Sequence, residues 1–318
     1  MAPKARASIS GSTKNIDESI GMLCSVTNDL RSLESNLLSI DNISLQWCCQ
    51  ATHFLNTIHS HFSIFTQKSE NPTSFWEGGT YLNLYMQETL TLLDLLNLIK
   101  LAISAMVRYR LIAEFTAQKL LAHSEYPNDA EIKCEVERLE GESRQLYGVQ
   151  RWKDIDFKMK CSPKVKGNDL NVMHVANVFR TIMAVISMLL FSVMFYPVSV
   201  EVDQKVFDQF PQLKSISTSL KNIVYVLSHR LHQIQDHSRP VLVEYKMTEK
   251  VVMHMKGDIL HGDAMDTRFT QKNSDLLQNS SMVLRNGLQL FENAVNEFFD
   301  EVTRGRNRLL GLCQQHYH

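Results

Sequence analysis

The stretch TIMAVISMLLFSVMFYPVSV, residues 181–200, contains no charged side chain and lies between Arg180 and Glu201. A helix built from it carries large apolar side chains on every side, so no face remains for water. Its length also matches the roughly 20 residues that an α-helix needs to span a bilayer. Either other helices of the chain or lipid must therefore surround it. The residues that we expect to represent this core or membrane segment are Thr181, Ile186, Leu190, Phe195 and Tyr196.

Two environments can surround this segment. Lipid is favoured by its length and by its flanks, because basic residues precede it and acidic residues follow it, which would place the N-terminus in the cytosol. Protein is favoured because the other helices have single apolar faces that need partners, and a bilayer would separate them. The Met, Ser and Ala residues of the segment also suit close packing. We predict a buried central helix, compatible with peripheral membrane association, and keep a single-pass membrane anchor as the alternative.

Composition excludes several classes of protein. The formal net charge is -1 and the pI is about 6.9, so no global basic field attracts nucleic acid, and we expect no nucleic-acid partner. Only 12 Gly and 7 Pro occur in 318 residues, which favours long helices. The six cysteines form no CxxC pair, so the usual zinc and thioredoxin patterns are absent and free thiols are expected.

Apolar residues recur three or four positions apart, which is the pattern of amphipathic helices. The segments with this pattern, together with the apolar one, are 17–40, 44–67, 80–123, 170–196, 213–234 and 274–318. No series of strands is indicated. The sequence therefore predicts an all-α fold, an elongated antiparallel helical bundle of about six long helices with a very apolar central helix at 170–200.

The remaining segments define the domain organisation. Residues 1–16 are short, polar and terminal, and we expect a disordered tail. Residues 17–318 are predicted to form a single helical bundle domain. Within it, residues 124–169 form a polar connector, whose acidic part at 129–146 is either a solvated helix or an extended segment.

Residues 238–273 are predicted to be irregular, because Pro240, Gly257 and Gly262 interrupt the apolar pattern. The run 241–245 could form an isolated short strand there, although no partner strand is evident.

No motif positions a nucleophile, a phosphate-binding loop or a zinc-binding helix. His53, His59 and His61 lie off the apolar stripe of their helix, and we expect them to face solvent. The nearest approach to a metal-ligand cluster is made by His254, His261, Asp263 and Asp266. Their spacing fits no known ligand pattern, so we expect no metal, no cofactor and no catalytic residue.

Several stretches of the chain resemble a known family. Residues 43–47 (ISLQW) resemble a Leu-Ser-Leu-x-Trp helix opening, 75–76 (FW) an aromatic segment before a long helix, and 92–97 (LLDLLN) a Leu-Leu-Asp-Leu-Cys-Asn stretch with Leu96 where Cys is usual. The apolar run after Val178 and the segment 298–312, with its Arg and Asn residues, match in position. In this order, over about 35–312, they resemble the plant BYPASS family, also called ROH-like proteins.

The resemblance implies a plant regulatory protein without known catalysis. Members of the family are linked to restraint of a mobile root-to-shoot growth signal and to binding of exocyst components that modulate secretion. We therefore expect a helical protein partner, such as an exocyst subunit, reached through helix–helix contacts. The expected location is the cytosol or the cytoplasmic face of endomembranes, ahead of a single-pass membrane position or a plastid. An enzyme of small-molecule metabolism is the remaining alternative.

Overall fold

The computed structural model describes residues 17–39, 42–69, 80–122, 129–147, 170–233, 241–261 and 267–315, and within these ranges the chain is helical with no strand. The all-α bundle predicted from the sequence is confirmed. After a short helical segment at 17–25, the helices are α2 (Thr27–Ser39), α3 (Leu45–Ser69), α4 (Thr80–Ala122), α5 (Asp129–Tyr147), α7 (Leu170–Met194), α8 (Lys214–Gln233), α9 (Val243–His261) and α10 (Thr267–Gln315). The predicted tail, residues 1–16, lies outside the described residues.

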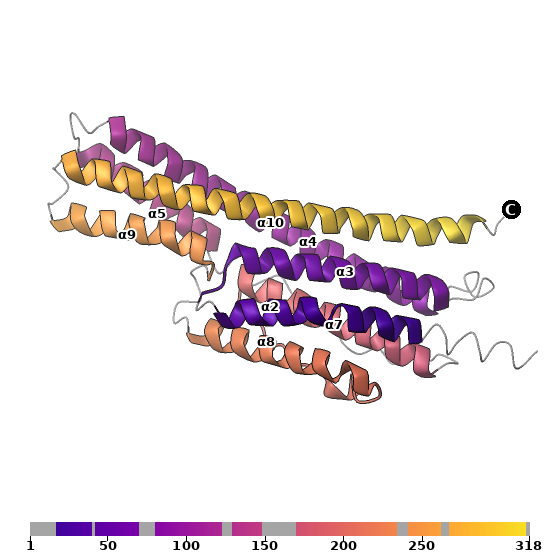
Figure 1. Cartoon of the computed structure of the whole chain (residues 1–318). Helices are drawn as coiled ribbons and strands as arrows, with labels where there is room; N and C mark the ends of the chain where they lie inside the picture. The colour runs from indigo at the N-terminus through magenta and orange to yellow at the C-terminus, as the bar shows by residue number, and fades with distance from the viewer. Residues whose placement is uncertain are drawn as a thin grey trace, which may run out of the picture.

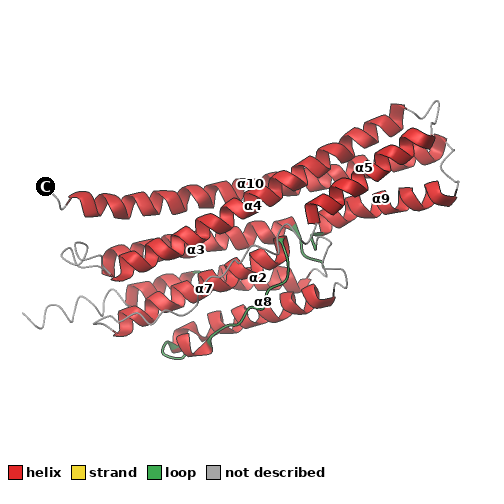
Figure 2. Ribbon diagram, turned by 180° about the vertical axis from the view of Figure 1, so that it is seen from behind, coloured by secondary structure: helices red, strands yellow, loops and turns green. Residues whose placement is uncertain are grey.

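Two long helices organise the molecule. α4 has 43 residues and α10 has 49, which correspond to lengths of about 65 and 74 Å. They lie side by side and antiparallel, as Figures 1 and 2 show. At one end, α5 and α9 complete a four-helix bundle with them. At the other end α3 packs against both long helices and α7 packs against α3 and α4, with α2 and α8 outside. The chain is therefore elongated, as predicted.

The apolar helix α7 is enclosed by the chain's own helices. It packs against α3, α4 and α8, and the Phe179 ring lies 5.8 Å from that of Phe62 and 5.6 Å from that of Phe65, measured between centroids. The helix ends at Met194, close to Pro197, which disfavours helical backbone just before it. Residues 195–200 of the predicted apolar helix are therefore not helical.

The prediction that residues 238–273 are irregular is wrong for most of that range. Residues 243–261 form α9, which packs against α5 and α10. Gly257 did not end the helix, because nothing lies within 4 Å of the position of its missing side chain and the cost is limited to helix propensity. The possible strand is reduced to one parallel bridge between Leu242 and Ile43.

The predicted polar connector contains α5. Its sequence is acidic, but Ile132, Val136 and Leu139 are buried, and the helix packs against α4 and α9. The spacing of four and three residues is enough for a narrow apolar edge on an otherwise solvated helix. The rest of the connector, residues 124–128 and 148–169, lies outside the described residues.

Together, α5 and α9 add two helices to the six long ones predicted. Both belong to the bundle end that the sequence pattern indicated least clearly.

Candidate functional site

The residues predicted to represent the core or membrane segment lie in two different environments. Thr181, Ile186 and Leu190 are completely buried in α7. Phe195 and Tyr196 follow the end of the helix and are half-buried. Both rings pack against Phe191, at centroid distances of 4.9 and 5.1 Å. Four of these aromatic and aliphatic side chains therefore contribute to packing, and only the last two reach the edge of the core.

In the part of the chain that the structure describes, two helices are long and apolar enough to cross a membrane by length and composition. One is Val172–Met194 in α7, of which 89% of the most apolar window is buried inside the chain. The other, Leu82–Ala122 in α4, has the same mean hydropathy, 1.8, but only 39% of its window is buried. The sequence pattern of α4 predicted an ordinary amphipathic helix, so this second apolar segment was not expected.

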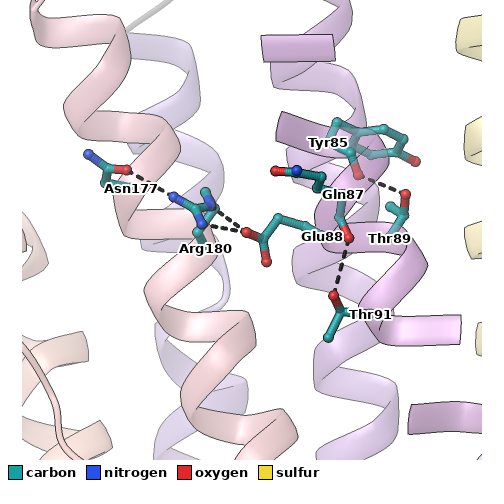
Figure 3. A network of polar contacts seen from close by, with 7 residues as sticks. All are labelled: Tyr85, Gln87, Glu88, Thr89, Thr91, Asn177 and Arg180. Carbon is teal, nitrogen blue, oxygen red and sulfur yellow. Dashed lines mark hydrogen bonds and ion pairs between the residues drawn. The ribbon is translucent and has the colours of Figure 1, made fainter. Parts of the chain in front are cut away.

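A buried ion pair joins α7 to α4, as Figure 3 shows. The Arg180 Nε donates to Glu88 Oε1 at 2.8 Å, and a second guanidinium nitrogen donates to the same oxygen. The side chains of Arg180 and Glu88 are only 3% and 8% exposed. Arg180 also reaches Asn177 one turn earlier on α7. Burial raises the pKa of Glu88 above its usual value, and this effect outweighs the opposing effect of Arg180.

A second polar cluster joins α3, α4 and α10 in the core. His59, which the sequence predicted to face solvent, is completely buried, and its Nε2 lies 2.9 Å from the Tyr85 hydroxyl. Burial lowers the pKa of His59 to about 3 and raises the pKa of Tyr85 to about 12. Both groups are therefore neutral at physiological pH. The prediction failed because the polar partner of His59 comes from another helix.

A glycine of α10 allows this cluster to form. A Cβ at Gly305 would lie 2.3 Å from the Tyr85 hydroxyl and 3.2 Å from the His59 ring. Arg306, the next residue on α10, also contacts α4. Its guanidinium donates to the Met86 carbonyl and to the Thr89 hydroxyl, each at 2.7 Å. Tyr85 and Thr89 lie one turn apart on α4 (Figure 3).

These polar groups hold helices together and offer little to a substrate. His59 is neutral and inaccessible, so it cannot act as a general base near pH 7. The carboxylate of Glu88 is occupied by Arg180. We interpret both clusters as polar connections that fix the register of four helices in an otherwise apolar core.

A third polar contact joins the two ends of the molecule. The Glu244 carboxylate accepts the backbone N–H of Leu45 through both oxygens, at 3.0 and 3.1 Å. This N–H is one of the unpaired donors at the start of α3. Beside it, the Val243 N–H donates to the Ile43 carbonyl at 2.9 Å. Glu244 thus ties the start of α9 to the start of α3.

The long helix α4 carries large exposed apolar side chains along its length. Leu90, Leu101, Leu111 and Phe115 are 54%, 58%, 51% and 44% exposed. At 100° per residue, the four side chains fall within an arc of about 80°, so they lie on one side of the helix. We call these four residues the α4 outer face.

The residues resembling metal ligands do not gather in the part of the chain that the structure describes. His254 pairs with Asp258 at 2.7 Å on the exposed side of α9. The side chain of His261, and residues 263 and 266, lie outside the described residues. Among the described residues, no group of three His, Cys, Asp or Glu side chains could hold a metal.

Comparisons with protein-family models, with curated proteins and with solved structures gave no match.

Proposed function

We propose that this chain is a non-enzymatic interaction protein of the BYPASS-related type, which binds another helical protein through the α4 outer face. The observation that carries the proposal is the exposure of four large apolar side chains along one side of one helix. Leu98 and Ile112 lie half-buried beside them. An exposed apolar stripe of this kind suits the apolar face of an amphipathic partner helix.

The cellular role follows from the family resemblance. It consists of restraint of a root-derived growth signal or of regulation of secretion through an exocyst subunit. A helical exocyst subunit fits the helix–helix mode of binding that the α4 outer face offers.

A direct binding experiment tests the proposal. Purified exocyst subunits would be immobilised one at a time and probed with the full chain and with the double variant Leu111→Glu/Phe115→Glu. The control is Leu38→Glu, which places one negative charge on the 57% exposed Leu38 of α2, away from the α4 outer face. We expect one subunit to bind wild type and the control equally, and the double variant roughly tenfold or more weakly.

Failure of every exocyst subunit to bind would overturn the choice of partner. Equal binding of the wild type and the double variant would overturn the α4 outer face as the surface.

A membrane anchor is the second candidate, favoured by the two helices that meet the length and composition of a membrane span. Peripheral attachment at the cytoplasmic face of endomembranes would leave α7 packed inside the bundle. A single-pass arrangement through α7 would place α10 on the other side of the membrane. Asn279, within the sequence Asn-Ser-Ser, would then be open to glycosylation in the secretory pathway. A glycan at Asn279 would support this candidate, and an unmodified Asn279 would favour the first.

A further inference from the structure

α10 carries a second heptad repeat outside its buried seam. Residues 276–296 read LLQNSSM, VLRNGLQ and LFENAVN, three heptads that each have an aliphatic residue first and Asn fourth. The second position of each heptad is buried and forms part of the core, at Leu277, Leu284 and Phe291. The first and fourth positions lie on the outside of the helix.

The outer positions are open to solvent along the whole repeat. Leu276 and Val283 are each 41% exposed and Leu290 is 61% exposed. The three Asn residues, Asn279, Asn286 and Asn293, are exposed as well. We call these six residues the α10 outer seam. Figure 1 shows α10 running along the front of the molecule, with no described helix crossing it.

The spacing of the outer seam is that of a coiled coil. Its members follow one another at intervals of three and four residues, which is the a/d pattern that packs one helix against another. A shallow groove lies at its N-terminal end, lined by Lys272, Asp275, Leu276 and Asn279 among others. The inner seam of α10 already binds α3, α4 and α9, so this second seam is available to a further helix.

We propose that the α10 outer seam binds the same seam of a second copy of this chain, with the two α10 helices parallel and in register. The surface differs from the α4 outer face, so the proposal goes beyond the proposed function and does not rest on it.

The α10 outer seam is complementary to itself, and this identifies a second copy of the chain as its partner. An Asn amide has both donors and an acceptor, so one Asn can pair with another. In a parallel, in-register pair, each Asn meets its own counterpart and each aliphatic residue meets an aliphatic residue. A buried Asn pair of this kind also fixes the register of a coiled coil.

The antiparallel arrangement is less favourable. When the two antiparallel helices overlap over the whole seam, Asn279 lies opposite Leu290 and Val283 lies opposite Asn286. Every amide then faces an aliphatic side chain. An unpaired buried amide costs about 1–3 kcal/mol. This arrangement does bring Lys272 near Glu297 of the second copy, but an exposed ion pair contributes only about 0–1 kcal/mol. The amides therefore decide in favour of the parallel pair.

The size of the seam sets the expected strength of association. The distance along the axis from Leu276 to Asn293 is about 26 Å at 1.5 Å per residue. A strip about 10 Å wide covers a few hundred Å² on each copy, less than the roughly 800 Å² per partner of a standard interface. We therefore expect a weak dimer that dissociates in the range of about 0.1–1 mM.

Sedimentation velocity of the full chain over this concentration range tests the proposal. Wild type should shift from monomer to dimer, and Leu290→Glu should remain monomeric. Leu310→Glu is the matched control, because Leu310 is a 46% exposed leucine of the same helix beyond the seam. The control should dimerise like wild type. Circular dichroism would confirm that both variants fold.

A cysteine at the seam tests the orientation. In the parallel pair, Asn279→Cys faces its counterpart closely enough for a disulfide to form. In the antiparallel pair, the two cysteines lie eleven residues apart along the axis, about 16 Å, which is too far. A disulfide-linked dimer of Asn279→Cys, absent from wild type with its six native cysteines, is the expected result.

Wild type that stays monomeric at all concentrations would overturn the proposal. A dimer insensitive to Leu290→Glu would overturn the surface. Dimerisation without the Asn279→Cys disulfide would overturn the parallel register.

Discussion

Replacing Gly305 with Ala tests the polar cluster at the centre of the core. In a helix, this change usually stabilises by about 1 kcal/mol. Here the added Cβ would lie 2.3 Å from the Tyr85 hydroxyl, which is already bonded to His59 at 2.9 Å. The Tyr85 ring must therefore move by about 1 Å or α10 must shift away from α3 and α4.

The expected cost combines two effects. Overpacking of a dense core costs about 1–3 kcal/mol. Loss of the bond between His59 and Tyr85 leaves two buried polar groups unpaired, at about 1–3 kcal/mol. After the gain in helix propensity, Gly305→Ala should lower the free energy of unfolding by about 1–5 kcal/mol.

Urea unfolding followed by circular dichroism measures this cost. Gly311→Ala on the same helix is the control, because nothing lies within 4 Å of its added Cβ, and it should raise stability by up to about 1 kcal/mol. In a Tyr85→Phe background, which lacks the obstructing oxygen, Gly305→Ala should cost clearly less. A Gly305→Ala variant as stable as wild type, or an undiminished cost in the Tyr85→Phe background, would refute the reasoning.

Three further predictions concern buried titratable groups. Arg180→Met leaves Glu88 buried without its cation and should cost about 3–5 kcal/mol in urea unfolding, while changing both residues to Met should cost less. A double variant that costs as much as Arg180→Met and Glu88→Met added together would show that the pair is not coupled. Burial raises the pKa of Glu244 above its ordinary value of 4.5, so its ionised form is disfavoured in the folded state. Wild type should therefore gain stability relative to Glu244→Gln as the pH falls from neutral through the folded pKa, and parallel pH profiles would contradict this. Burial also raises the pKa of Cys48, so timed alkylation followed by mass spectrometry should label it far more slowly than the exposed Cys134. Equal labelling rates would place Cys48 at the surface.

The buried seams could be predicted from the sequence because they repeat with the helical period. Leu284, Phe291 and Phe298 recur every seven residues and are all buried on α10. Ile186 and Leu190 were expected inside because their helix has no polar side, and both are buried. In these cases, the local pattern alone decides which side chains lie inside.

Contacts between distant helices could not be predicted in the same way. The burial of His59 depends on Tyr85, 26 positions later, and Arg180 meets Glu88 across 92 positions. No periodicity links the members of these pairs. A polar residue type suggests a position at the surface, and for His59 this suggestion was misleading.

The inner and outer seams of α10 show a second limit of prediction from the sequence. Both repeat every seven residues, so the amphipathic pattern of 274–318 does not by itself show which of the two faces the core. Only the packing of α10 against α3, α4 and α9 shows that Leu276 and Leu290 face outwards. α9 itself was missed because Gly257 was treated as a helix breaker.

The central claim is that the chain's own helices, and not lipid, enclose α7. Alkaline carbonate extraction of membranes from cells that express the tagged full chain tests it most directly. The packing of α7 predicts that the protein is released into the supernatant together with peripheral proteins. Retention in the pellet with integral membrane proteins would contradict the claim, because it would mean that an apolar helix spans the bilayer.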